Sequence, residues 1–188
     1  RGKRLVLFDT GEALLLPLII VLKHRLHPGQ NLSQDQIDQI QSDGFHEDGL
    51  SYSYRALGRR EFSEEALKKR ILARGIPETI AQDIIGHLRE QGYLNDDRIL
   101  AARIQDLFEC SHYGAYLVRL KMREKGFQDD LVDQWFENHP EEIWNWQMDS
   151  LDYWIRKRKI NCPPADWKER SAAWQFLQGK GFSSDLIE

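Results

Sequence analysis

The sequence has few of the features that mark secreted or membrane-bound proteins. It contains only two cysteines, Cys110 and Cys162, which are too few for a disulfide framework and favour a reducing compartment. The apolar run from Leu14 to Leu22 is interrupted by Pro17, whereas a membrane-spanning helix needs about 20 apolar residues. No signal peptide is apparent. These absences predict a cytoplasmic protein that does not enter the membrane.

Motifs for catalysis and for cofactor binding are also missing. There is no glycine-rich phosphate loop and no recognisable Ser or Cys nucleophile. Asp96 and Asp97 are adjacent, so on a helix their carboxylates point apart and make a poor acid–base pair. Cys110 and His112 have ligand-like spacing, but no second Cys/His pair completes a zinc set. We therefore expect no catalysis, no metal and no cofactor.

The balance of charge restricts how the chain could bind nucleic acid. It carries 26 basic and 30 acidic residues, for a net charge of −4 and an isoelectric point near 5.9. A protein that grips nucleic acid with its whole surface is usually basic. Any contact with DNA must therefore come from local basic patches, and such a contact would be weak.

What the sequence does contain is a repeated way of ending a helix. Three glycines, Gly75, Gly126 and Gly181, stand at near-equal spacing, each directly after a basic residue. An apolar residue lies four positions before each glycine and another directly after it; these are Ile71, Met122 and Leu177, then Ile76, Phe127 and Phe182. Glycine adopts the left-handed conformation that ends a helix, and the next residue then packs back on that helix.

The repeated pattern predicts the fold class and the domain organisation. Each glycine joins two helices, and a further helical stretch precedes each pair, so three helices make one unit. We expect a mainly α protein, an elongated tandem array of three three-helix repeats behind a small N-terminal β-hairpin and helix segment. The predicted boundaries are 1–50 for the N-terminal segment and 51–98, 99–140 and 141–188 for the repeats.

The N-terminal segment has a different pattern from the repeats. Two apolar runs flank the polar stretch from Asp9 to Glu12, which is typical of a hairpin. Ser33 should cap a short helix whose residues Ile37 and Ile40 face inward. Residues 41–49, QSDGFHEDG, contain two glycines, and we expect them to form a flexible joint.

The stretch 56–104 contains a distinctive set of residues: Ala56–Leu57, Arg60, Ser63, Leu67, the turn Arg74–Gly75–Ile76 and the motif Gly-Tyr-Leu-Asn-Asp-Asp-Arg at 92–98. Through these residues the stretch resembles a known family, the RecX regulatory proteins of bacteria. The similarity extends over nearly the whole chain and is most specific in the first unit. The family usually has Asp at position 95 and Phe at position 99, where this chain has Asn95 and Ile99. In the second unit, CSHYGAY lacks the arginines that usually follow its glycine.

The resemblance implies a function that the residue pattern alone does not supply. A RecX protein is expected to bind the RecA recombinase, to lie in the groove of the RecA filament on DNA and to restrain ATPase, strand-exchange and coprotease activities without catalysing a reaction. Periodicity alone predicts a helical scaffold that presents one face to a partner. Two alternatives stay open: a helical module that binds DNA directly, and a generic protein-interaction scaffold. We expect a monomer in each case.

Basic residues on the helices that precede the repeated glycines are the candidates for contact with RecA or DNA. A further dense basic run lies at 156–159. The candidates are Lys68, Lys69, Arg70, Arg74, Arg119, Lys121, Arg123, Lys125, Arg156, Lys157, Arg158 and Lys159. They could form a discontinuous stripe facing phosphates or an acidic protein surface. Alternatively they are solvated helix faces with partners such as Glu64 for Lys68 and Glu65 for Lys69.

Overall fold

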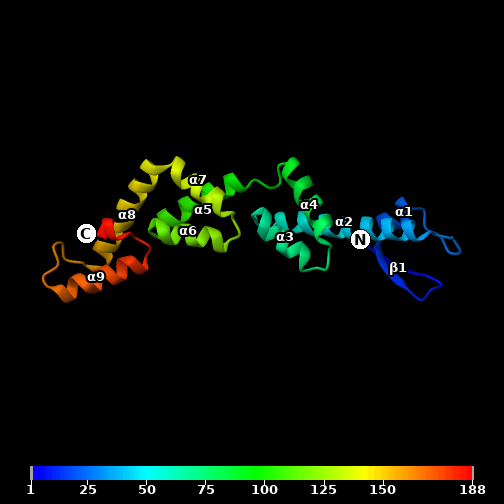
Figure 1. Cartoon of the computed structure of the whole chain (residues 1–188), viewed down its shortest axis with the longest axis horizontal. Coiled ribbons are helices and arrows are strands. Elements are labelled where there is room, and N and C mark those ends of the chain that lie inside the picture. The colour runs from blue at the N-terminus through cyan, green and yellow to red at the C-terminus, as the bar shows by residue number, and fades with distance from the viewer. Residues whose placement is uncertain (1, 188) are drawn as a thin grey trace. The chain divides into compact units, whose positions relative to one another are not determined.

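A computed structural model of the chain describes residues 2–187. It divides into two compact units, the first ending at Leu94 and the second beginning at Asn95. Within the described residues the second unit is entirely helical, and the first adds one hairpin to its helices (Figure 1). The predicted mainly α repeat fold with a small N-terminal hairpin is confirmed. The predicted boundaries after residues 50, 98 and 140 stay predictions.

The first unit contains a hairpin and four helices. In chain order they are β1 (Lys3–Leu7), β2 (Ala13–Pro17), α1 (Leu18–Lys23), α2 (Gln34–Leu57), α3 (Glu64–Leu72) and α4 (Glu78–Glu90). The strands are antiparallel, with Leu5 opposite Leu15. Side chains alternate across a strand, so Leu16 packs inward on Ile20 and Ile40 while Leu5 and Leu15 stay exposed.

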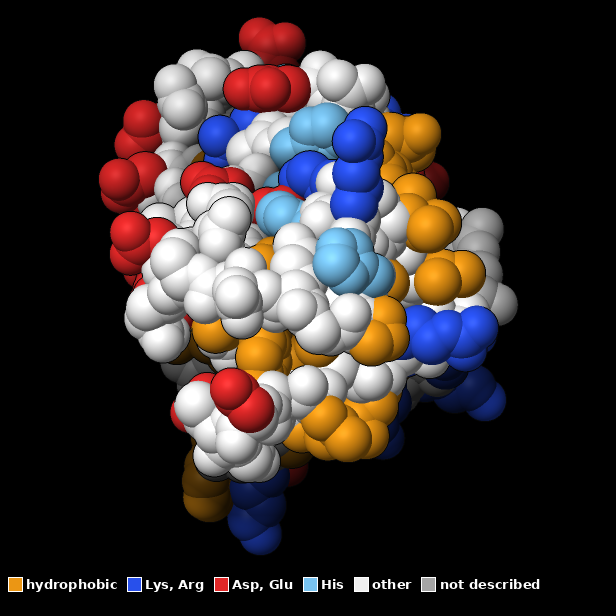
Figure 2. Space-filling model, turned by 90° about the vertical axis from the view of Figure 1, so that its right-hand side faces the viewer, with side chains coloured by type: hydrophobic (Ala, Val, Ile, Leu, Met, Phe, Trp, Pro, Cys, Tyr) orange, Lys and Arg blue, Asp and Glu red, His pale blue; other side chains and the backbone are white. Residues whose placement is uncertain are grey.

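The lobe formed by the hairpin and α1 has exposed apolar side chains on its surface. Besides Leu5 and Leu15 these include Leu7, Ile19 and Leu22. Figure 2 shows apolar side chains on the face at this end of the first unit, interspersed with Lys, Arg and His side chains. This surface is therefore mixed in character rather than one continuous apolar patch.

The prediction of a flexible joint at 41–49 is wrong, because these residues lie inside the continuous helix α2. Ser33 does cap this helix, and Gln36 completes a capping box by accepting a hydrogen bond from the Ser33 amide. The two glycines are places of close packing. A Cβ on Gly44 would lie 2.9 Å from Leu16 Cδ2, and one on Gly49 would overlap Ile84 Cδ1. The absent side chains let the hairpin and α4 approach α2.

One side chain ties α1 to α2 through several partners. Asp43 lies 2.6 Å from Lys23 Nζ and 2.8 Å from His24 Nε2, and Gln39 donates a hydrogen bond of 2.9 Å to it. Desolvation alone would raise the pKa of Asp43. The hydrogen bonds from Lys23, His24 and Gln39 outweigh it and lower the pKa from 3.8 to about 2. The charged form of Asp43 therefore stabilises this corner.

The second unit contains six helices within the described residues. They are α5 (Asp96–Glu109), α6 (Ala115–Glu124), α7 (Asp129–Asn138), α8 (Pro140–Arg158), α9 (Trp167–Gly179) and α10 (Ser184–Ile187). The Asn95 side chain caps α5 by accepting a hydrogen bond of 2.9 Å from the Arg98 amide. Val132 and Phe136 are the buried residues of α7. Leu131 and Trp135 are only partly buried beside them.

The predicted helix-ending glycines are confirmed. Gly75, Gly126 and Gly181 have φ angles of +78°, +87° and +89°. Phe127 N donates to Met122 O over 3.2 Å and Phe182 N to Leu177 O over 3.3 Å, which is the hydrogen bond of a Schellman helix end. Each apolar residue after a glycine lies in the same core as its predicted helix partner.

A contact between two glycines, Gly114 and Gly181, joins α6 to the turn after α9, and we call it the glycine clasp. Gly114 N donates to Lys180 O over 2.8 Å, and Tyr116 N donates to Gly181 O over 3.1 Å. The unpaired amides at the start of α6 therefore satisfy carbonyls at the end of α9. A Cβ on either glycine would overlap atoms of the other segment. Gly75 differs, since a Cβ there would meet nothing within 4 Å.

Buried polar side chains on α8 complete the junction around α6. Gln147 Oε1 accepts a hydrogen bond of 3.1 Å from the Ala115 amide. Ser150 Oγ donates to Phe108 O over 3.2 Å, and Trp154 Nε1 donates to His112 O over 2.7 Å. One face of α8 therefore binds the corner between α5 and α6. Across residues 2–187, no helix is both long and apolar enough to cross a membrane.

Candidate functional site

A group of basic side chains lies in the first unit, around the end of α2 and the end of α3. Five arginines line a hollow of about 400 Å³ together with Tyr52, Ala56 and Phe62. They are Arg55, Arg59, Arg60, Arg70 and Arg74. We call this group the arginine hollow. Each of the five residues is exposed, so a ligand in solution can reach all of them.

Local sequence explains why the arginines converge. Gly58 ends α2, and Arg59 N and Arg60 N both donate to Ala56 O, at 3.1 Å and 3.3 Å, which wraps the chain around the helix end. Arg70 lies in the last turn of α3, and Arg74 lies in the turn that follows this helix. Phe62 is buried, and Arg60 and Arg70, one from each segment, both lie over its ring.

Aromatic rings support three of the five guanidinium groups. Arg60 and Arg70 lie over the Phe62 ring, at 4.5 Å and 5.0 Å from its centroid, and Arg74 lies 4.3 Å from that of Tyr52. Such contacts stabilise by about 0.5–1 kcal/mol at exposed sites. They also restrict the side chains to few rotamers. The guanidinium groups are therefore partly ordered before any partner arrives.

No carboxylate neutralises the arginine hollow. No acidic residue lines it, and across residues 2–187 none of the five arginines forms an ion pair with Asp or Glu. Arg55 instead donates from Nε to Ser51 O over 3.0 Å. An adjacent hollow that Arg55 and Arg74 also line contains Asp48, but its carboxylate is 2.6 Å from Lys3 Nζ. The hollow therefore concentrates positive charge on a chain whose net charge is −4.

The other two candidates on α3 lie outside the hollow. Lys68 Nζ is 3.1 Å from Glu78, and Lys69 Nζ is 3.5 Å from Glu65. The expected partner of Lys68, Glu64, pairs with Arg89 instead. Lys68 and Lys69 therefore belong to ordinary ion pairs on a solvated helix face.

Candidates on α6 differ sharply from those in the arginine hollow. Arg119 is 3.1 Å from Asp133, and Arg123 is 2.9 Å from Asp129 and 3.0 Å from Asp133. Lys121 lies 5.2 Å from the Tyr113 ring centroid, and Lys125 is the residue that ends the helix. Aspartates on α7 thus balance both arginines within the same unit.

The basic run at the end of α8 spreads in several directions. Arg156 pairs with Asp152 at 2.8 Å, while Lys157 donates to the Tyr153 hydroxyl over 2.7 Å. Arg158 lies over the Phe176 ring, 4.3 Å from its centroid. Lys159 follows the helix in the left-handed region, with φ +53°. These four residues therefore form no single charged face.

The sequence did not point to Lys180 as a candidate. Its Nζ lies near three aromatic rings, 4.3 Å from the Trp154 centroid, 5.6 Å from that of Phe176 and 5.9 Å from that of Tyr113.

Arg55, Arg59 and Arg60 were also not among the predicted candidates. The adjacent pair Arg59–Arg60 beside a helix-ending glycine was the available signal. Arg55, Arg59 and Arg60 lie neither on a helix that ends at a repeated glycine nor in the basic run at 156–159.

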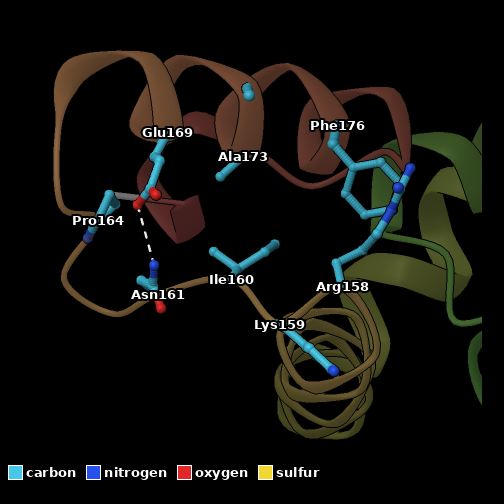
Figure 3. A pocket seen from close by; sticks show the side chains of 9 residues that line it. Arg158, Lys159, Ile160, Asn161, Pro164, Glu169, Ala173 and Phe176 are labelled. Atoms are coloured by element: carbon cyan, nitrogen blue, oxygen red, sulfur yellow. Dashed lines mark hydrogen bonds between the residues drawn. The ribbon is translucent and has the colours of Figure 1, made fainter.

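A pocket of about 380 Å³ between the end of α8 and α9 has no catalytic arrangement (Figure 3). Its one carboxylate, Glu169, accepts hydrogen bonds from Asn161 Nδ2 at 3.2 Å and Ala165 N at 3.0 Å. At the edge of the pocket the Arg158 guanidinium lies over the Phe176 ring, and Ala173 lines the wall of the pocket. Glu169 closes the 159–166 loop, and no nucleophile lies beside it. In residues 2–187, no group of three His, Cys, Asp or Glu could hold a metal ion.

The fold and site define a class of protein: helical repeats of three-helix units with an uncompensated basic hollow. A family model described as the third three-helix domain of RecX matches residues 147–188. The regulatory protein RecX of Pseudomonas fluorescens is 30% identical over 70% of this chain and 81% of its own length. The chain belongs to the RecX family of regulatory proteins.

Further relatives and solved structures agree with this assignment. The regulatory protein RecX of Stenotrophomonas maltophilia is 29% identical over 71% of this chain and 80% of its own length. A crystal structure of regulatory protein RecX superposes with a TM-score of 0.70 and 21% identity, covering 98% of this chain and 90% of that one. RecX from Lactobacillus salivarius gives a TM-score of 0.63 at 16% identity, over 76% and 92% of the chains. At these identities the two structures support the fold.

Proposed function

We propose that this chain is a non-enzymatic regulator that binds the RecA recombinase filament on DNA. In this proposal it inhibits the ATPase, strand-exchange and coprotease activities of RecA, and it acts as a cytoplasmic monomer. Membership of the RecX family is the observation that carries the proposal.

The arginine hollow is the surface of this chain best suited to contact the filament. Its five guanidinium groups are accessible, and within residues 2–187 they have no carboxylate partners. A RecA filament on DNA offers phosphates and protein carboxylates, and arginine binds both with a planar fork of donors. Two of the twelve residues proposed from the sequence, Arg70 and Arg74, line this surface. The paired residues Arg119, Arg123 and Arg156 are weaker candidates.

The experiment is an assay of DNA-dependent ATP hydrolysis by RecA with increasing amounts of this protein. We expect inhibition below one molecule per RecA, together with shorter filaments in electron micrographs. Unchanged ATP turnover and unchanged filament length at a large excess of the protein would refute the proposal.

A matched pair of variants tests the surface itself. Arg70→Glu with Arg74→Glu should weaken inhibition, because both reverse charge in the arginine hollow. Lys68→Glu with Lys69→Glu changes the same number of charges on the same helix but outside the hollow, and should weaken inhibition less. Equal loss in the two variants would mean that overall charge, rather than the arginine hollow, governs binding.

One alternative function is favoured by the same surface. A module that binds DNA directly, without a recombinase partner, would also use an uncompensated group of arginines. It would slow RecA only by competing for DNA. Adding excess DNA would then restore ATP turnover completely, whereas binding to RecA itself predicts inhibition that persists.

A further inference from the structure

The arginine hollow contains five positive side chains, and the acidic residues of the described structure do not neutralise them. Like charges repel at short range, and none of these five arginines has a carboxylate partner within residues 2–187. The equivalent helix of the second unit pairs both of its arginines with aspartates. An uncompensated group of this kind is stabilised when an anionic ligand binds. The question is which anion fits.

The surroundings of the hollow favour a ligand that offers charge and hydrogen-bond acceptors but little apolar surface. Phe62 is only 7% exposed, and guanidinium groups lie over it and over Tyr52. Protein partners usually insert apolar or aromatic anchors at the centre of an interface, whereas guanidinium groups lie over the aromatic rings of this hollow. Stacking of nucleic-acid bases also needs free ring faces. Contact with a phosphate backbone needs only the charged donors.

We propose that the arginine hollow is a phosphate-binding site that holds the sugar–phosphate backbone of nucleic acid without reading base sequence. Arg55 and Arg59 come from the end of α2 and the turn after it, and Arg70 comes from α3. Donors on both sides of the hollow can therefore contact successive phosphates. The inference names a ligand for the proposed binding to the RecA filament. It rests on that function only in one respect, namely that the filament is where the protein meets nucleic acid.

The test is the affinity of the full chain for a fluorescein-labelled homothymidine oligonucleotide, measured by anisotropy across a series of salt concentrations. The triple variant Arg55→Gln, Arg59→Gln, Arg70→Gln should bind at least about tenfold more weakly at low salt. Its logarithmic salt slope should be smaller by about 2, since each lost phosphate contact on a single strand removes about 0.7. A mixed-sequence oligonucleotide of equal length should bind as well as homothymidine.

The matched control removes three arginines that are already paired. Arg119→Gln, Arg123→Gln and Arg156→Gln cause the same change in net charge but lie outside the hollow. We expect affinity within about twofold of the original chain and an unchanged salt slope. Circular dichroism of both variants establishes that they are folded. Equal affinities and slopes in the two triple variants would overturn the proposal.

Two competitors distinguish the possible anions. Inorganic tripolyphosphate should displace the oligonucleotide from the original chain, whereas polyglutamate of matched charge should displace it poorly. If polyglutamate binds the hollow more tightly than the oligonucleotide does, the hollow is a docking site for acidic protein and the proposal is wrong. If tripolyphosphate binds and the oligonucleotide does not, the assignment to nucleic acid is wrong.

Inhibition of RecA by the same variants separates this inference from the proposed function. A Gln variant of the hollow that keeps full affinity for DNA overturns the phosphate site, whatever its effect on RecA. A chain that binds DNA through the hollow yet never inhibits RecA overturns the proposed function and leaves the site in place.

Discussion

The two units contain the same helix-ending glycine but handle the charge on the preceding helix in opposite ways. In the first unit Arg70 and Arg74 lie over aromatic rings and have no acidic partner within the described residues. In the second, Arg119 and Arg123 are both bound to Asp133 on α7. Relative to the glycine, Arg119 matches Lys68, which is paired with Glu78 on α4, so it is the arginines at other positions of the first unit that lack acidic partners among the described residues. The number of basic residues on a helix is therefore a poor guide to the charge that a ligand can reach. Whether the neighbouring helix supplies acidic partners decides how much of that charge stays free.

The glycines differ between the units as well. Gly75 and Gly181 both adopt positive φ angles, but only Gly181 is in close contact with another backbone segment. In the first unit glycine serves the conformation of the turn alone. In the second it serves both the turn and the packing of α6 against the end of α9. A repeated sequence motif thus has an added role in one copy.

The largest effect should come from breaking the glycine clasp. Gly181→Ala places a Cβ against Leu117 and also strains a left-handed residue, so we expect a loss of about 3 kcal/mol or more. Gly75→Ala strains only the backbone and should cost about 1 kcal/mol. Thermal and urea unfolding of both variants measures the difference. Equal losses would show that the close approach of Gly181 contributes nothing.

The next effect tests how much the close packing of α2 against α4 at Gly49 contributes to stability. Gly49→Ala would force Ile84 to move, and we expect a loss of about 1–3 kcal/mol. Gly86→Ala, on α4 of the same unit, meets nothing within 4 Å and should stabilise the helix by about 0.5–1 kcal/mol. Urea unfolding supplies both values. Equal effects of the two substitutions would mean that the close approach of Ile84 to Gly49 contributes nothing to stability.

A smaller effect should appear in acid. The folded pKa of Asp43 is depressed to about 2, so its stabilising contribution is complete above the unfolded pKa near 3.9 and is lost as pH falls toward 2. Allowing for solvent screening, we expect about 1 kcal/mol. Asp43→Asn should therefore be less stable than the original chain at pH 6 and nearly equal to it at pH 2. A constant difference across this range would mean that the charge of Asp43 is not responsible.

The smallest effect should come from making the second unit resemble the first. Asp129→Asn with Asp133→Asn releases Arg119 and Arg123 from their partners. We expect affinity for an oligonucleotide to rise about threefold, with a salt slope steeper by about 1. Stability should change by less than about 1 kcal/mol, because these ion pairs are exposed. Unchanged binding would show that freed charge on α6 does not reach phosphates.

Much of the site was not predictable from the chain in isolation. Arg70 and Arg74 were proposed because they lie on a helix before a repeated glycine, and both line the hollow. Lys68 and Lys69 had the same sequence signal but lie among carboxylates. Arg55, Arg59 and Arg60 were missed because they precede no repeated glycine and belong to no long basic run. The pairing of a charge depends on residues distant in the chain, and local patterns do not contain it.

The sequence by itself determined where the helices end, because those signals act over a few residues. Glycine permits a left-handed conformation, a following apolar residue packs back on the helix, and Ser33 and Asn95 cap the next ones. Only the tertiary structure decided what Gly44, Gly49 and Gly114 do, since their role depends on Leu16, Ile84 and Gly181 approaching them. It also decided which arginines stay uncompensated. Charge pairing and close packing are properties of surfaces brought together by folding, whereas helix ends are properties of the local chain.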